Sequence, residues 1–290
     1  MLHLDRVRIR HAGGTGGLKA DKFPEFRSLI GCRPPVSTDS WAIFGIPGGK
    51  DLDYPQGVLK VDLHTHTSDD PVDDVPYSTY ELIDRAAQLG YHALAITLHE
   101  RQLGLQPFVD YAAARGITLI PGIERTIEGR HVLLLNFTPA TEWVNTFADL
   151  RELKTREPRG LVIAPHPYFP IGVALRGMMD RHADLFDVVE CNAMFTRVLD
   201  FNRKARRWAR AHGKPMVGNG DVHRLRQLGS TYSVVDARPE AGAICEAIRN
   251  GRVEVHAEPL SIASAATLVW QLMARDLVKE LLRPAPAGHL

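Results

Sequence analysis

The feature that most constrains this chain is a regular alternation of short apolar runs with longer amphipathic segments, which begins at Val58. Short apolar runs bounded by turn residues predict buried strands, and the segments between them carry apolar residues at helical spacing. Strands that alternate with helices form βα units around a largely parallel sheet. Because 290 residues with 44% apolar side chains suffice for one large core, we predict an α/β barrel as the main domain.

The alternation predicts elements along most of the chain. We expect strands at residues 58–63, 93–97, 118–123, 131–137, 161–164, 187–191, 216–218, 231–235 and 253–256. We expect helices at residues 77–89, 108–115, 142–156, 197–211 and 241–250, and a short helical stretch before residue 187. Ser78 or Thr79 is the candidate N-cap of the first helix. The turn Glu128-Gly129 predicts that the fourth strand pairs back on the third.

Composition divides the chain into three parts. Residues 1–57 are rich in Gly and Pro and lack periodicity, which predicts an irregular N-terminal extension. Residues 58–260 are expected to form the barrel, and residues 261–290 a C-terminal amphipathic helix and tail. The run ending in Gly49-Lys50 is not a phosphate loop, because Asp51 stands where a Ser or Thr would be needed.

Charge and cysteine content exclude several classes of protein. A net charge of +1 gives no global field that would attract nucleic acid. Cys32, Cys191 and Cys245 lie far apart in the sequence, which fits a reduced cytosolic protein better than a disulfide scaffold. No apolar run is long enough to span a membrane, and residues 1–10 lack the apolar core of a signal peptide. We therefore expect a cytoplasmic protein without membrane contact; the oligomeric state cannot be predicted.

Side chains that can bind metals follow the predicted strands. In chain order they are His64 and His66, His99 and Glu100, Glu124, His166, Glu190 and Asn192, and Asp221 and His223. Because the carboxyl ends of the strands in a βα barrel meet at one rim, we expect these side chains to converge on one pocket. Imidazoles mixed with carboxylates suit Zn, Mn or Fe, and the number of candidates allows two or three divalent ions.

Five short motifs resemble, in order, those of the PHP (polymerase and histidinol phosphatase) family. They are Asp62-Leu63-His64-Thr65-His66-Thr67-Ser68, Ala95-Ile96-Thr97-Leu98-His99, Pro121-Gly122-Ile123-Glu124, Ala164-Pro165-His166-Pro167 and Gly220-Asp221-Val222-His223. The resemblance implies a distorted (β/α)7 barrel, a trinuclear metal centre and hydrolysis of phosphate esters.

The resemblance also implies how the ligands divide among three sites. His64, His66, Glu124 and Asp221 are expected at the first site, and Glu124, His131 and His166 at the second. His99 and His223 are expected at the third with Asp70, although Asp69, Asp73 and Asp74 are alternatives for that acid. Leu98 departs from the family, which usually has Asp before the histidine. An acid at this position would orient a ligand, so we expect its absence to alter metal affinity at the third site.

Other residues carry open alternatives. His131 is either a ligand or a histidine on the outer surface of a strand, and Glu190 and Asn192 either bind substrate or cap a strand end. Arg176 and Arg197 lie shortly after strand ends, where a guanidinium can grip a phosphate. We predict catalytic roles for His166, Asp221 and His223, and substrate binding by Arg176, Arg197 and Asn192.

These residues predict hydrolysis of a small phosphomonoester, such as a nucleotide or histidinol phosphate, by metal-bound hydroxide. The alternatives are an exonuclease acting on nucleic-acid ends and a metal-binding accessory module without activity. The basic run Arg203-Lys204, Arg206-Arg207 and Arg210 would serve an exonuclease, or it is simply a solvated helix face.

Overall fold

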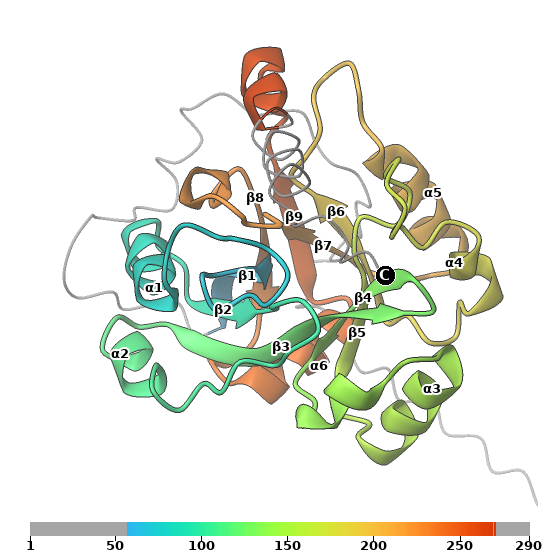
Figure 1. Cartoon of the computed structure of the whole chain (residues 1–290), viewed down its shortest axis with the longest axis horizontal. Coiled ribbons are helices and arrows are strands. Elements are labelled where there is room, and N and C mark those ends of the chain that lie inside the picture. The colour runs from blue at the N-terminus through green and yellow to red at the C-terminus, as the bar shows by residue number, and fades with distance from the viewer. Residues whose placement is uncertain (1–56, 269, 271–290) are drawn as a thin grey trace, which may run out of the picture. The chain divides into compact units, whose positions relative to one another are not determined.

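The computed structural model describes residues 57–268 and residue 270, and everything below refers to them. In this part of the chain nine strands form one sheet that curves into a nearly closed barrel (Figure 1). The strands are β1 Val58–Thr65, β2 Ala93–Ile96, β3 Thr118–Ile127, β4 Arg130–Leu135, β5 Leu161–Ala164, β6 Val188–Asn192, β7 Met216–Asn219, β8 Thr231–Asp236 and β9 Val253–Ala257. Each predicted strand segment is present, and the α/β barrel is confirmed.

The sheet runs in the order β7-β6-β5-β4-β3-β2-β1-β8-β9. The pairs β1–β2, β2–β3, β5–β6 and β6–β7 are parallel, as the βα repeat predicts. Strand β4 is antiparallel to both of its neighbours, and the predicted hairpin with β3 is confirmed. Strands β8 and β9 form a second antiparallel segment against β1. The sheet therefore has nine strands, as many as the strand segments expected from the sequence, in the distorted α/β barrel that the resemblance implied.

The two ends of the sheet approach each other at Gly218. Its backbone N–H donates to the Ser233 hydroxyl at 2.8 Å, and that hydroxyl donates back to the Gly218 carbonyl at 3.1 Å. At the rim, Thr65 forms a parallel bridge with Val222, just beyond β7. The two ends of the nearly closed barrel therefore meet beside the residues that follow β1 and β7.

Seven helical elements or turns of helix surround the sheet in the described residues: α1 Thr79–Gln88, α2 Val109–Ala113, η2 Pro139–Trp143, α3 Phe147–Arg156, α4 Met178–Arg181, α5 Asn202–Ala211 and α6 Ala241–Arg249. A further 3-10 turn, η3 Leu225–Gln227, follows β7. Ser78 is the N-cap of α1, in a capping box with Glu81. Thr146 and Asp149 form the same motif at α3, so the helix expected from residue 142 starts later.

Helix α5 begins at Asn202, five residues after the predicted start at 197. The Thr196 hydroxyl accepts the backbone N–H groups of Val198 and Leu199, at 3.3 and 2.9 Å. The Asp200 carboxylate accepts the N–H of Asn202 at 2.9 Å. Such local side-chain bonds compete with helical hydrogen bonds, so residues 196–200 form a loop.

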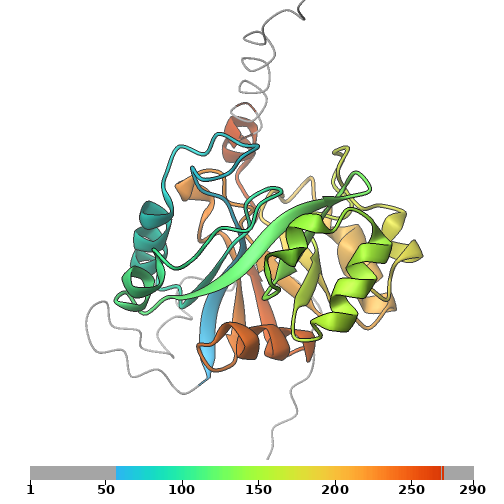
Figure 2. The ribbon, with the colours of Figure 1, turned by 60° about the horizontal axis from the view of Figure 1, so that its bottom comes forward.

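Three apolar clusters hold the sheet and the helices together. One fills the barrel interior and includes Leu63, Val217 and Ile244. A second lies between β3–β6 and helices α3–α5, and a third packs α1 and α2 against β2. Figure 2 shows α1 and α2 at the left of the barrel and α3–α5 at its right, all on the outer face of the sheet. Because α6 contributes Ile244 to the interior cluster, it covers one end of the barrel and leaves the other end to the strand-end loops.

Residues 262–268 and residue 270 are helical, which matches the start of the predicted C-terminal helix. The rest of that prediction and the predicted extension at residues 1–57 lie, except for Gly57, outside the described residues. Within the described ranges, no helix combines the length and the apolar character needed to cross a bilayer.

We predict that Gly218→Ala destabilises the barrel at its closure. A Cβ at this position would lie 2.7 Å from the Tyr232 carbonyl oxygen and 3.0 Å from a Val255 methyl carbon. Overpacking of this kind costs about 1–3 kcal/mol of unfolding free energy, measurable by urea titration. Gly104→Ala is the matched control, because a Cβ there meets nothing within 4 Å. Equal stability of the two variants would contradict a tight closure at Gly218.

Candidate metal centre

The strand ends converge because bridges beyond the regular ladders tie them together. The backbone N–H of His66 donates to the Val222 carbonyl at 3.1 Å, which brings the loop after β7 against the end of β1. A second bridge joins His99, just after β2, to Glu124 in β3. The pairing of β1 with β2 also shifts register between Asp62 and Thr65, an irregularity of the kind that re-aims side chains beside functional sites. The predicted convergence at one rim is therefore present.

Glu124 lies at the centre of the site, with only 1% of its surface exposed. Its Oε2 atom lies 3.0 Å from His64 Nε2, 3.3 Å from His66 Nε2 and 3.2 Å from His99 Nε2. Three imidazoles therefore surround a single carboxylate oxygen.

The other oxygen of Glu124 faces two further histidines. Its Oε1 atom lies 2.7 Å from His131 Nδ1 and 3.2 Å from His166 Nε2. Leu133 pairs directly with Glu124 across the β3–β4 ladder, so His131 occupies the diagonal position on the same face. Of the two alternatives for His131, the structure has the one in which its side chain faces the site.

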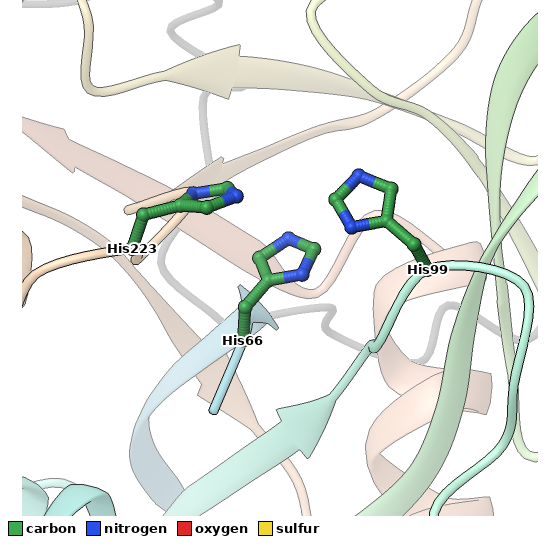
Figure 3. Close-up of side chains that lie close together, drawn as sticks. All are labelled: His66, His99 and His223. Carbon is green, nitrogen blue, oxygen red and sulfur yellow. The ribbon is translucent and has the colours of Figure 1, made fainter. Parts of the chain in front are cut away.

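Two of the imidazoles around Glu124, those of His66 and His99, also lie close to the His223 side chain (Figure 3). The rings of His66 and His99 stack at 4.6 Å, and those of His66 and His223 at 4.2 Å. Asp221 lies on the same side, with Oδ1 3.4 Å from both His64 Nε2 and His223 Nδ1.

Four groups of three described residues have ligand atoms within 4.8 Å of one another. They are His64, His66 and Asp221; His64, Glu124 and His166; His99, Glu124 and His131; and His66, His99 and His223. Two of the buried ring nitrogens, Nε2 of His66 and Nδ1 of His166, have no hydrogen-bond partner among the described residues. Buried polar atoms without partners are rare, and a mixed set of imidazoles and carboxylates is the donor set of Zn, Mn and Fe sites. The residues present therefore fit a metal centre.

Asp70 lies behind these histidines. Its Oδ2 atom is 2.9 Å from His66 Nδ1 and 3.0 Å from His99 Nδ1, on the side away from Glu124. It belongs to none of the four groups that the described residues form. Asp73, one of the alternatives for the acid at the third site, lies 2.9 Å from His223 Nε2.

Glu190 lies behind His64 in the same way. The strand that carries it, β6, is buried along its whole length, and the Glu190 side chain is fully buried. Its Oε1 atom lies 2.8 Å from His64 Nδ1. Of the two alternatives for Glu190, neither substrate binding nor strand capping describes this contact.

The charges in the site depend on one another. Burial lowers the pKa of His64, but Asp221, Glu124 and Glu190 raise it well above its ordinary value. Burial raises the pKa of Glu124, but His64 and its neighbours hold it well below the usual range. Burial also lowers the pKa of His99, which Glu124 and other acids raise to about 9. The carboxylates thus stabilise positive charge at the imidazoles. Either protons or metal cations can provide that charge.

Backbone conformation helps to aim these side chains. Glu100, His166 and Asp221 adopt positive φ values of 59°, 29° and 49°. Such values are uncommon for residues other than glycine and concentrate at functional sites. Each of these residues follows a strand end at the rim, where the chain must turn sharply.

The residues predicted to bind substrate differ in position. Asn192 is buried, and its amide lies 3.1 Å from Asp221 Oδ2 and 3.2 Å from Glu190 Oε2. Arg176 is exposed and donates to the Ile171 carbonyl within its own loop. Arg197 is exposed in the loop before α5. No described contact joins either arginine to the metal-site groups.

Two residues at the site were not identified from the sequence. The Asp62 carboxylate accepts the backbone N–H groups of His64 and Gly220 at 3.1 and 3.0 Å, and burial raises its pKa to about 7. Asn219 donates to Glu190 Oε1 at 3.0 Å. Asp62 interrupts an apolar strand, and a buried acid in such a strand is a signal that could have identified it.

Comparisons with known proteins agree with this arrangement. The model of the PHP domain matches residues 62–162, and that of the PHP-associated region matches residues 200–253. This chain therefore belongs to the PHP family, as the resemblance predicted. A search of curated proteins finds no match.

Solved structures show the same fold. A two-domain protein from Bacteroides vulgatus, described as containing a predicted PHP-like metal-dependent phosphoesterase, has 19% identity and a TM-score of 0.57; the match covers 74% of this chain and 70% of that chain. PsfC from Pseudomonas syringae has 16% identity and a TM-score of 0.52, with 77% of this chain and 100% of that chain covered.

We predict that Glu124→Gln abolishes tight metal binding, because both oxygens of Glu124 face imidazole nitrogens and an amide nitrogen would replace one of them. Loss of a partner behind a ligand typically costs 10–100-fold in metal affinity, so loss of this central group should cost more than about 100-fold. Equilibrium dialysis with elemental analysis measures the change. Glu152→Gln is the control, because the Glu152 side chain is 68% exposed and pairs with Arg156 on the surface of α3. Unchanged metal content in Glu124→Gln would contradict a centre built on Glu124.

Proposed function

We propose that this protein is a metal-dependent phosphoesterase that hydrolyses a small phosphomonoester, such as a nucleotide or histidinol phosphate. The observation that carries the proposal is the packing of five imidazoles around the two oxygens of Glu124, with Asp221 beside them. This donor set suits Zn, Mn or Fe, and the four overlapping groups leave room for two or three ions.

Bound divalent cations would neutralise phosphate charge and lower the pKa of a water molecule, which is the chemistry that phosphoester hydrolysis needs. We assign His64, His66 and Asp221 to one ion, and Glu124 with His131 and His166 to a second. For a third ion we assign His99 and His223, with Asp73 as the acid that lies closest to His223.

Exposure of the site supports attack at a terminal phosphate. His64 and His66 are fully buried, and the exposed fractions of the side chains rise only to 12% at His223, 14% at His131 and 20% at Asp221. A phosphate at the end of a molecule can reach such a site more easily than one in the middle of a chain. We expect the substrate to enter beside His131, Asp221 and His223.

The side chains that border this opening would handle substrate and protons. With only two ions bound, His223, whose Nε2 lies 2.9 Å from Asp73 Oδ2, would be free of metal and could donate a proton to the leaving oxygen. The Asn192 amide holds Asp221 in place at 3.1 Å, so it would act through Asp221 and not through direct substrate contact. His166 Nδ1, buried and without a partner among the described residues, is the other candidate for proton transfer.

An exonuclease remains the second candidate because of α5. Arg203, Lys204, Arg207 and Arg210 are exposed on this helix, and the nearest acid to Arg203 is Asp200, 3.8 Å away just before the helix. The side chain of Asn202 donates to the Asn192 carbonyl at 2.9 Å, which ties the start of α5 to the site. A nucleic-acid strand that ends at the metal centre could lie along these cations.

We predict that the metal-loaded protein releases phosphate from a nucleoside monophosphate or another small phosphomonoester. A screen of phosphoesters with Zn, Mn and Fe would measure this, with His64→Ala as the inactive control. Against a short single-stranded RNA we expect slower hydrolysis and little effect of salt. Faster cleavage of the RNA, with a rate that falls steeply as salt rises, would favour the exonuclease. Metal bound in full with no turnover on any substrate would favour an accessory module.

A further inference from the structure

The buried carboxylate of Glu190 has four polar neighbours. Oε1 lies near His64 Nδ1 at 2.8 Å and Asn219 Nδ2 at 3.0 Å. Oε2 lies near the backbone nitrogen of His166 at 2.7 Å and Asn192 Nδ2 at 3.2 Å. One side chain of β6 therefore joins β1, the loop after β5, β6 itself and β7.

Three of these four neighbours can only donate. The backbone N–H of His166 is a donor by nature. Asn219 must turn its NH₂ group toward Glu190, because its Oδ1 accepts the Leu63 N–H at 3.1 Å. Asn192 is fixed in the same way, because its Oδ1 accepts the Met194 N–H at 2.9 Å. Glu190 is thus the acceptor in three of its four contacts, the arrangement that suits a carboxylate without a proton.

The fourth neighbour must therefore donate as well. His64 carries a proton on Nδ1, because a carboxylate without a proton can only accept. In a neutral imidazole the other nitrogen then bears the lone pair. That nitrogen, Nε2, is the one that lies 3.0 Å from Glu124 Oε2.

Asp70 sets the position of the ring proton on two more histidines in the same manner. Its Oδ1 accepts the backbone N–H groups of Val72 and Asp73, both at 2.9 Å, and its Oδ2 accepts that of His99 at 3.0 Å. The remaining contacts of Oδ2, to Nδ1 of His66 and of His99, must also be donations to it. Both rings therefore direct Nε2 toward Glu124.

We propose that Glu190 and Asp70 are positioning residues that set the tautomer of the histidines, Glu190 for His64 and Asp70 for His66 and His99. They ensure that the Nε2 lone pair, and not the proton, points into the metal centre. This inference rests on the metal-binding part of the proposed function and deepens it. It also gives Asp70 a place behind the ligands instead of among them.

Glu190→Gln tests the tautomer assignment of His64. The amide would put an NH₂ group against either His64 and Asn219 or His166 and Asn192, and both pairs are donors. We expect zinc affinity, measured by equilibrium dialysis, to fall about 10–100-fold, as for other partners behind metal-binding histidines. Glu152→Gln, on the exposed face of α3, should bind zinc as the wild type does.

Asp70→Asn tests the tautomer assignment of His66 and His99 by the same reasoning. Nitrogen NMR of labelled histidines distinguishes the effect of Asp70 from that of Glu190. In the zinc-loaded wild type we expect Nδ1 of His64, His66 and His99 to be protonated and Nε2 to bind zinc. Glu190→Gln should alter the His64 signals, and Asp70→Asn those of His66 and His99. A purely structural role would lower stability without changing these signals selectively.

The outcomes distinguish this inference from the proposed function. Zinc bound through Nδ1 of these histidines in the wild type, or unchanged affinity in both variants, overturns the inference and leaves the function standing. The wild-type spectrum decides the matter even if a variant does not fold. The expected tautomers without hydrolysis of any phosphoester would support the inference and overturn the function. A wild type that binds no zinc overturns the tautomer assignment as well.

Discussion

The structure depends on one buried carboxylate. Moving an ion of this size out of water costs several kcal/mol even after the protein relaxes, so Glu124 is tolerated only beside compensating positive charge. Five imidazole nitrogens lie within 3.3 Å of its two oxygens. No single strand can provide such a shell. The closed sheet can, because it brings the ends of β1, β2, β4 and β5 to one rim around β3.

Positive charge at these nitrogens can come from protons or from metal cations. Protonated imidazoles would satisfy Glu124, and the raised pKa values of His64 and His99 describe that state. A divalent cation replaces several such protons at once and binds the lone pairs that Glu190 and Asp70 direct inward. Those two carboxylates, held by donors on their other faces, make the arrangement specific. The rim loops then need sharp turns, which explains the left-handed backbone at His166 and Asp221.

Much of this could be predicted from the sequence, because the strands are compact apolar runs and the ligands follow them directly. The position of His131 facing Glu124 depends on the β3–β4 register, which the turn at Glu128-Gly129 indicated. The start of α5 could not be predicted by periodicity. The Thr196 and Asp200 side chains accept nearby backbone N–H groups, so these residues form a loop and the helix begins later.

Other features depend on distances that no motif contains. The choice between Asp70 and Asp73 is one of them, because both follow β1 within a short loop and only the fold decides which faces His223. Likewise, Arg176 was expected near a phosphate, but its side chain turns back to the Ile171 carbonyl. Leu98 replaces an acid of the family and is fully buried in the cluster between β2 and the outer helices. The acid that the family has before His99 is thus absent here, while Asp70 holds the His99 ring.

Anomalous diffraction from crystals loaded with Mn²⁺ or Zn²⁺ tests the central claim most directly. We expect at least two anomalous peaks bordered by Nε2 atoms of the clustered histidines, with Glu124 between the peaks and Asp221 beside one of them. A site without peaks, in which the ring nitrogens still contact Glu124 directly under saturating metal, would contradict it.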